Sequence, residues 1–242
     1  MYNKYYELNI NLYLLKNLLM QDSYQEISKL INYSFNKSKY LSKLHKEKDF
    51  KHYSFSGLYP IEKDKIYKAN EIYCIIIRSY KKEIIDELIK CFMNLKNDTF
   101  VVTNTNYKEW LTNKQVNYVD SLTPTIIMLK GKDKFWEARK RDSELLKQSV
   151  FLNAISKYQM LNNDIVNYKY EDIIDNISVK NNIAIIVNYK NIKLLGYKLR
   201  VKFKQNIEAQ NIANLATVEG LGAKNSTLGM GFVKPYFTRK DT

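Results

Sequence analysis

The two histidines of the sequence lie close together and beside a lysine. His45 and His52 are the only histidines among 242 residues, and Lys51 immediately precedes the second. A histidine near its reference pKa of about 6.5 takes or gives a proton at neutral pH, and a lysine supplies positive charge. The sequence has no H-x-x-x-H pattern, no acidic pair beside a histidine and no supported D-x-D motif, so metal-dependent chemistry lacks a recognisable site. These residues favour acid–base chemistry without a metal.

Glycine is concentrated near the C-terminus. Of the seven glycines in the chain, four form a G-x-G-x₆-G-x-G pattern: Gly220, Gly222, Gly229 and Gly231. Paired glycines permit positive φ angles and close approach of another chain, and successive N–H groups can form an anion-binding nest. The residues between the pairs add donors suited to phosphate: Lys224, Asn225, Ser226 and Thr227. A P-loop and a dinucleotide fingerprint do not fit, because here a helix precedes the glycines and a strand follows them.

The charge balance points to a polyanionic partner. Lys and Arg number 39 against 25 Asp and Glu, a formal net charge of +14 that both halves of the chain share. Nucleic acid is the commonest partner of such a protein, although an AT-rich genome enriches lysine without any partner. Four cations alternate with apolar residues near the end of the chain: Lys198, Arg200, Lys202 and Lys204. A strand with this alternation carries them on one face, where either a polyanion or the solvent at a sheet edge accommodates them. We favour the polyanion.

The composition is that of a folded cytoplasmic protein. Hydrophobic residues make up 45% and charged residues 26%, which is ordinary for a packed core. No uncharged apolar stretch reaches the roughly 18 to 20 residues of a membrane span, and no secretory leader is recognisable. Cys74 and Cys91 are too few for a disulfide framework, and we expect buried thiols in a reducing compartment.

Hydrophobic periodicity predicts two similar halves. The first half should contain a strand, helix, strand, strand, helix and strand at residues 5–15, 23–47, 50–59, 71–79, 81–95 and 99–105. The second half should start near Pro124 with TPTIIML and continue with helix 135–161, strands 183–189 and 194–204, helix 207–217 and strand 228–234. A basic cluster opens its long helix, and we expect it to be solvated: Trp136, Arg139, Lys140 and Arg141. The order predicts an α+β protein of two tandem ferredoxin-like (RRM-like) βαββαβ domains, residues 1–118 and 119–242, with a C-terminal glycine-rich loop.

The glycine pattern ends in G-M-G-F-V and resembles the glycine-rich loop of the repeat-associated CRISPR proteins, the RAMP superfamily. Together with HKEKDFKHYSFSGL at residues 45–58, the SLTPTIIML segment and the chain length, it makes the chain similar to the Cas-six family over nearly its whole length. The resemblance implies a metal-independent endoribonuclease that processes CRISPR repeat RNA, and a product that becomes the guide of an interference complex.

RNA carries its own nucleophile, the 2′-hydroxyl, so cleavage needs a base, an acid for the 5′-oxygen and a cation for the crowded phosphorane. In this family a histidine after the first long helix, a lysine downstream and a tyrosine on that helix form the site. The resemblance assigns these roles to His45 and Lys51, with His52 as a second histidine candidate. Tyr33 or Tyr40 would be the tyrosine, and spacing favours Tyr33. Alternatively, His45 only stabilises the C-terminus of a helix.

With RNA as the expected polyanion, the charge pattern and the glycine motif predict which residues bind it. They are the strand cations and the glycine-rich loop: Lys198, Arg200, Lys202, Lys204, Gly220, Gly222, Lys224, Asn225, Ser226, Thr227, Gly229 and Gly231. We expect no cofactor, no metal and no membrane, a role in antiviral defence, and a monomer or homodimer. The expected partners are CRISPR repeat RNA or crRNA and other Cas proteins of a type I interference complex. A catalytically inactive repeat-RNA-binding subunit and a non-specific nucleic-acid binder are the alternatives.

Overall fold

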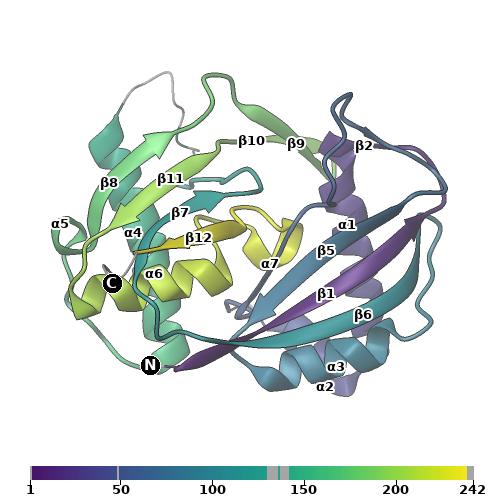
Figure 1. Ribbon diagram of the computed structural model, residues 1–242, viewed down its shortest axis with the longest axis horizontal. Coiled ribbons are helices and arrows are strands. Elements are labelled where there is room, and N and C mark those ends of the chain that lie inside the picture. The colour runs from purple at the N-terminus through teal and green to yellow at the C-terminus, as the bar shows by residue number, and fades with distance from the viewer. Residues whose placement is uncertain (1, 48, 130–135, 137–141, 239–242) are drawn as a thin grey trace.

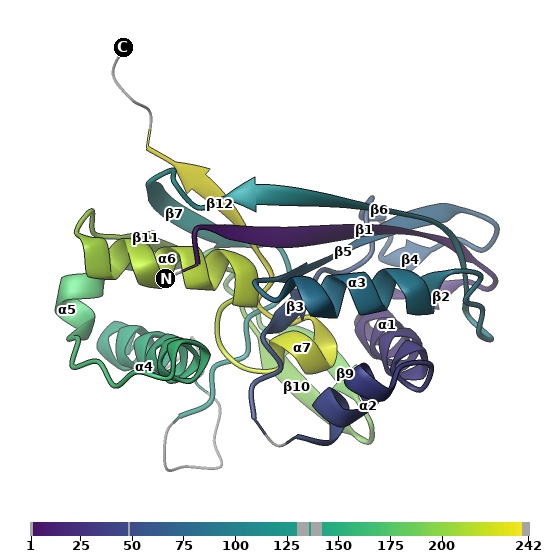
Figure 2. The ribbon, with the colours of Figure 1, turned by 90° about the horizontal axis from the view of Figure 1, so that it is seen from below.

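The protein consists of two four-stranded antiparallel sheets that lie side by side (Figure 1). The computed structural model describes residues 2–47, 49–129, 136 and 142–238. Seen from below, the helices lie on one side of the two sheets, and the opposite face of both sheets is open (Figure 2). The predicted α+β class is confirmed.

The first half has the predicted ferredoxin-like order. In spatial order its sheet contains β3 (Tyr53–Phe55), β5 (Ile72–Ser79), β1 (Lys4–Leu14) and β6 (Phe100–Leu111). Its helices are α1 (Met20–Phe35), α2 (Lys39–Lys46) and α3 (Lys82–Phe92), and a small ribbon pairs β2 (Leu18–Leu19) with β4 (Ile66–Tyr67). The alternation of β1 turns Leu8, Ile10 and Leu12 into a core beneath α1 and α3, where they are fully buried. Period-two patterning therefore predicted this strand correctly.

The helix predicted over residues 23–47 is two helices. α1 ends at Phe35, and the Ser38 side chain caps α2 by accepting a hydrogen bond from the Leu41 N–H at 3.3 Å. The Ser42 hydroxyl donates a hydrogen bond of 2.8 Å to the Phe35 carbonyl, and this bond stabilises the turn between the two helices. Serine and asparagine compete for backbone hydrogen bonds and favour helix ends, so the N-K-S sequence at 36–38 interrupts the periodic pattern. The break places His45 in a short helix of its own.

The second half repeats the order in a longer form. In spatial order its sheet contains β12 (Val233–Phe237), β7 (Val116–Ser121), β11 (Leu199–Phe203) and β8 (Ile174–Val179). The hairpin β9 (Ile185–Tyr189) and β10 (Ile192–Gly196) projects from it, and the helices are α4 (Ser143–Asn162), α5 (Tyr170–Ile173), α6 (Ile207–Glu219) and α7 (Asn225–Leu228). Both halves thus have the strand order of a ferredoxin-like fold.

Several boundaries of the second half differ from those predicted. Its first strand is β7, whereas TPTIIML forms only isolated bridges, because Pro124 lacks an N–H group and the backbone beside it bonds to residues 220–231. The strand predicted over 194–204 divides into β10 and β11, and β8 was not predicted. The last strand starts at Val233, after the short helix α7. The predicted basic cluster at Arg139, Lys140 and Arg141 lies outside the described residues.

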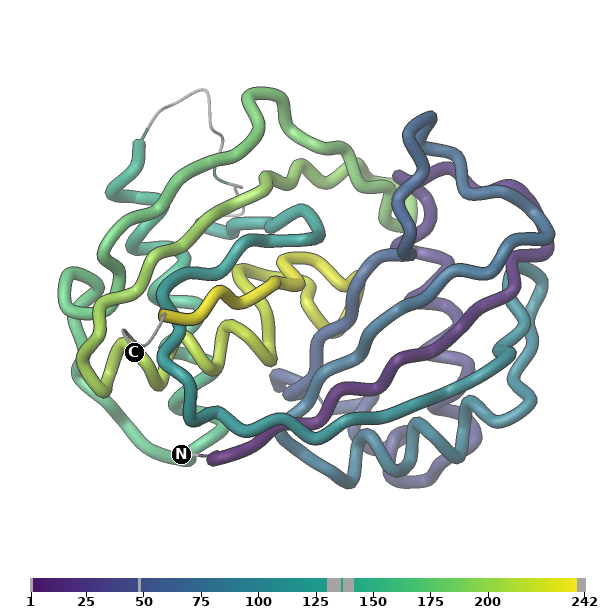
Figure 3. The backbone as a smooth tube through the Cα atoms, in the orientation of Figure 1, coloured from purple at the N-terminus to yellow at the C-terminus, as the bar shows by residue number. Residues whose placement is uncertain are grey.

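The chain passes once from the first sheet to the second. Figure 3 traces this passage from β6 into β7 through residues 112–115. Residue 118, the boundary predicted from the sequence, lies inside β7. The division into two folding domains stays a prediction.

Three apolar clusters hold the molecule together. Each sheet packs with its helices around a large buried cluster of its own. A third, smaller cluster joins the halves and combines α1, the β9–β10 hairpin and the glycine-rich region: Tyr24, Ile126, Val187, Leu194, Leu228 and Met230. Burial of apolar area is the main favourable term in such packing, at about 25 cal/mol per Å². The third cluster therefore brings the last part of the chain against α1.

Candidate active site

A pocket of about 450 Å³ opens where the two halves meet. The residues that line it come from four stretches of chain: Gln25, Ser28, Lys29 and Asn32 of α1, His45, Lys51 and Tyr53 around α2 and β3, Tyr189 and Lys190 at the end of β9, and Ser226 and Thr227 of α7. Three of these residues are lysines and none is acidic, so the His45 pocket suits an anion. The structure thus brings together His45 and Lys51, the pair predicted to act together.

His45 lies in the last turn of α2 and is exposed. Its ring meets the buried Phe35 ring edge-on, with centroids 5.8 Å apart. Within the described part of the chain, neither ring nitrogen of His45 has a hydrogen-bond partner, so both can face a ligand. The position at a helix C-terminus also fits the dipole role that we named as the alternative.

Lys51 is half-buried on the segment that leads into β3. Its Nζ donates to the backbone carbonyl of Glu47. Burial lowers the pKa of Lys51, because the charged form loses part of its hydration. A partly desolvated ammonium group interacts more strongly with a phosphate than a fully hydrated one.

Tyr53 is one of two tyrosines that line the pocket, with Tyr189, and neither was predicted from the sequence. Its side chain is buried, and its hydroxyl donates to the Ser226 carbonyl at 2.9 Å. Burial raises the pKa of the Tyr53 phenol, so the group stays protonated at neutral pH. The predicted tyrosines, Tyr33 and Tyr40, are exposed and do not line the pocket. The pKa of Tyr40 is raised, first by burial and then by the carboxylate of Glu83. Glu83 belongs to α3, so Tyr40 lies near that helix instead.

His52 does not join His45 in the pocket. It is 7% exposed, has a left-handed φ of 54°, and its Nδ1 lies 2.8 Å from Oε1 of the buried Glu219 at the end of α6. Its backbone carbonyl accepts a hydrogen bond from Ser79 at 2.7 Å. The His52–Glu219 pair therefore connects the segment that follows α2 to the second half of the molecule.

The glycine-rich loop (residues 220–231) has the backbone conformation that its glycines predicted. All four glycines have positive φ, between 65° and 76°. A Cβ atom on Gly229 would lie 2.6 Å from the Phe55 ring, so the loop packs closely on β3. The nest interpretation is wrong for the amides of residues 221, 223 and 228–231, because they donate to carbonyl groups within the protein.

Only part of the predicted RNA-binding loop reaches the surface. The four glycines are buried, and so is Asn225, whose amide donates to the carbonyls of Leu221 and Met230. The partly exposed residues are Lys224, Ser226 and Thr227. Tyr189 was not predicted, although its ring lies under two ammonium groups: that of Lys190 at 5.4 Å and that of Lys224 at 5.7 Å.

Arg200 and Lys202 of the predicted row lie in β11, in the middle of a sheet, and Lys198 and Lys204 flank this strand. β11 pairs with β7 on one side and β8 on the other, so the edge-strand alternative is wrong. Arg200 donates two hydrogen bonds to Asp120, at 2.7 and 2.6 Å, and Lys202 pairs with Asp175 at 2.7 Å. These carboxylates on neighbouring strands reduce the repulsion between the cations of the row. That repulsion therefore does not by itself require a polyanion.

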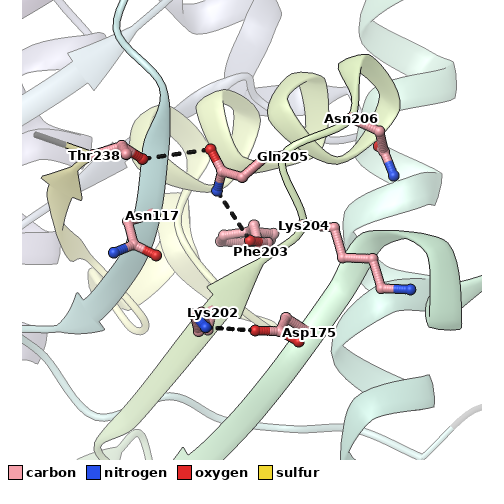
Figure 4. A pocket seen from close by; sticks show the side chains of 8 residues that line it. All are labelled: Asn117, Asp175, Lys202, Phe203, Lys204, Gln205, Asn206 and Thr238. Carbon is pink, nitrogen blue, oxygen red and sulfur yellow. Dashed lines mark hydrogen bonds and ion pairs between the residues drawn. The ribbon is translucent and has the colours of Figure 1, made fainter. Parts of the chain in front are cut away.

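The row and the His45 pocket occupy different places. The half-buried Lys198 donates to the Leu122 carbonyl, and no cation of the row lines the His45 pocket. Lys202 and Lys204 line a separate, shallow pocket near Gln205, where Lys202 faces its carboxylate partner and Lys204 extends away from it (Figure 4). The structure therefore does not gather all the predicted RNA-binding residues into one site.

The described residues hold neither a metal-binding cluster nor a membrane-spanning helix. These residues contain no group of three or more His, Cys, Asp or Glu side chains placed to hold a metal ion. Among the same residues, no helix is long and apolar enough to cross a membrane.

No protein-family model and no curated protein sequence matches this chain. Solved structures match it over nearly its whole length. One described as a RAMP protein binding different RNA substrates has a TM-score of 0.71 at 18% identity, and the match covers 96% of this chain and 99% of that one. A CRISPR-associated protein Cas6 gives 0.67 at 18%, covering 96% and 99%. The chain has the Cas6 fold. A structure from work on a Cas6-related gene of Pyrococcus furiosus agrees, with 0.67 at 19% identity and coverage of 95% and 98%.

The Cas6 fold confirms the tandem ferredoxin-like architecture that the sequence resemblance implied. At identities of 18% and 19% the likeness shows the fold, and the chemistry has to be argued from the side chains of this chain. In this chain, the Cas6 fold places His45 and Lys51 together in a pocket at the junction of its two halves.

Proposed function

We propose that this protein is a metal-independent endoribonuclease that cleaves CRISPR repeat RNA (pre-crRNA) to give mature guide RNA. The observation that carries the proposal is the joint position of His45 and Lys51 in a basic pocket of a chain with the Cas6 fold. The similar structures are described as Cas6 and as an RNA-binding RAMP protein, which supports repeat RNA as the substrate. Other Cas proteins of a type I complex are the partners we propose.

The cleavage step uses the 2′-hydroxyl of the substrate as nucleophile. The ring nitrogens of His45 have no hydrogen-bond partner among the described residues. His45 can therefore exchange protons with the 2′-oxygen or the departing 5′-oxygen. Lys51 stabilises the charge that builds up on the phosphorane. The Tyr53 hydroxyl donates its proton to the Ser226 carbonyl and so holds the loop against this side of the pocket. The bond from phosphorus to the 5′-oxygen breaks as the bond to the 2′-oxygen forms, so the products are a 2′,3′-cyclic phosphate and a 5′-hydroxyl.

Incubation of the purified protein with repeat RNA in EDTA tests this function. We expect a single cut, because no step of the mechanism uses a metal, and mass spectrometry of the upstream product should show a cyclic phosphate. Cleavage that requires added Mg²⁺ would contradict the mechanism. Tight binding without a cut would instead support the inactive RNA-binding subunit.

We propose further that the row of cations on and beside β11, Lys198, Arg200, Lys202 and Lys204, binds RNA backbone and contributes affinity more than rate. Lys202→Ala combined with Lys204→Ala should flatten the log–log salt dependence of repeat-RNA binding by about one to two units, because each phosphate contact contributes about 0.7 to 0.9. Binding titrations over a range of salt concentrations measure this slope.

Lys82→Ala combined with Lys90→Ala is the matched control for this prediction. Both lysines are exposed and ion-paired on α3, as Lys202 is on β11, so the control removes the same charge from another face. An unchanged slope in the Lys202/Lys204 variant, or an equal change in both variants, would contradict the proposal that these cations bind RNA.

A further inference from the structure

Lys157 is a buried lysine of α4 that the proposed mechanism does not use. It is 2% exposed. Its ammonium group donates to the Asn225 side-chain oxygen at 2.6 Å and to the carbonyls of Gly220 and Gly222 at 3.0 and 3.1 Å. The Glu219 carbonyl lies at 3.4 Å. Three good acceptors match the three N–H donors of an ammonium group.

The acceptors of Lys157 are neutral oxygens of the loop and of the end of α6. No carboxylate in the described residues forms an ion pair with this ammonium group. Burial lowers the pKa of Lys157 to about 8, although the nearby Glu219 opposes the shift. A buried cation is costly unless its surroundings are organised around it, and a helix C-terminus is the favourable end for a cation. Positive φ at Gly220 and Gly222 lets the loop present its carbonyls to one point.

The contacts of Lys157 continue to one side of the His45 pocket. The side-chain oxygen of Asn225 accepts a hydrogen bond from Lys157, and its amide donates to the Leu221 and Met230 carbonyls. Asn225 thus connects the two arms of the loop. Ser226 follows directly and lines the pocket, and its carbonyl accepts the Tyr53 hydroxyl. Any displacement of Asn225 therefore moves this side of the pocket.

The first half of the molecule is attached to the same end of α6. Arg78 donates to the Thr217 carbonyl at 3.0 Å, and the Ser54 hydroxyl donates to the Val218 carbonyl at 2.5 Å. His52, which directly follows Lys51, bonds to the Glu219 carboxylate. Both sides of the pocket thus meet at the last turn of α6.

We propose that Lys157 is a positioning residue, whose ammonium group fixes the glycine-rich loop on the end of α6 and so sets Ser226 and Tyr53 at the correct distance from His45. The effect on cleavage rests on the function proposed above. The effect on loop order does not depend on it.

Lys157→Met tests the proposal, because methionine fills similar space and removes every donor. We expect faster amide hydrogen exchange in peptides covering 220–231, with peptides of β1 unchanged. Single-turnover cleavage should fall by on the order of 10²-fold, which is what a misplacement of about 1 Å can cost. Affinity for an uncleavable 2′-deoxy repeat RNA should stay close to that of the wild type. Lys157→Arg, which restores donors and charge, should recover loop protection and much of the cleavage.

Lys147→Met is the matched control, since Lys147 lies on the same helix and pairs with Glu144 near the surface. It should change neither measurement. Unchanged loop exchange in Lys157→Met overturns the proposal, and so does a loosened loop with undiminished cleavage. If Lys157→Met does not fold, a folded Lys157→Arg with an unprotected loop overturns it, and a protected loop supports it. A wild type that cuts no repeat RNA refutes the proposed function, while the exchange measurement still decides the role of Lys157 in the loop.

Discussion

Replacing His45 by alanine should lower the single-turnover rate constant for repeat-RNA cleavage by about 10²- to 10⁴-fold, the usual contribution of general acid–base catalysis. Affinity for the RNA should remain, because it depends on phosphate contacts spread over the molecule and a single imidazole adds little to them. Rate and binding are to be measured on the same preparation. A loss of activity that only follows a loss of binding would not support the assignment.

His52→Asn is the control for this prediction. Asparagine tolerates the left-handed φ of 54° and keeps an N–H donor for Glu219, whereas alanine would leave that buried carboxylate without its partner. The cleavage rate should therefore change much less than in His45→Ala. Equal losses in both variants would mean that the site uses two histidines and that Lys51 serves binding. If neither variant loses activity, the inactive RNA-binding subunit becomes the better description.

A repeat RNA with deoxyribose at the nucleotide upstream of the scissile phosphate should not be cut at all. The substitution removes the 2′-hydroxyl, which is the nucleophile of the proposed reaction, and it leaves the protein and the phosphate charges unchanged. Binding should be nearly that of the all-ribose substrate. Denaturing gel electrophoresis after prolonged incubation reads out the result.

The control for this substrate is an RNA with a single deoxyribose two nucleotides away from the cut. It should be cleaved almost as fast as unmodified RNA. Cleavage of the substrate that lacks the attacking 2′-hydroxyl would refute the mechanism, because an activated water molecule would then be the nucleophile. That outcome would leave the Cas6 fold untouched, since the fold rests on separate comparisons.

Sequence patterns predicted the elements whose signals are local. Alternation in β1 and the helical period of α3 match the structure to within a few residues, because one face of each element is buried along its length. The four paired glycines also predicted a turn with positive φ, because glycine adopts this conformation without a steric cost. The resemblance of the region around His45 and Lys51 also pointed to two residues that the fold does bring into one pocket.

The tertiary structure decided which side chains accompany them. Tyr53 rather than Tyr33 or Tyr40 lines the pocket, because a break after Phe35 redirects α2 and β3 brings its first residue beside the loop. The predicted row on β11 turned out to be balanced by Asp120 and Asp175, which belong to strands on either side of it.

Hydrogen bonds between residues far apart along the chain could not be predicted from the sequence. The hydrogen bond between His52 and Glu219 joins residues 167 positions apart, and that between Lys157 and the Gly220 carbonyl joins residues 63 positions apart. A polar group that is buried loses its hydrogen bonds to water and needs a partner within the protein. The fold supplies that partner from whichever segment packs beside it, however distant in the sequence. Local patterns record which face of an element is buried, and only the packing of one element on another determines which polar groups meet there.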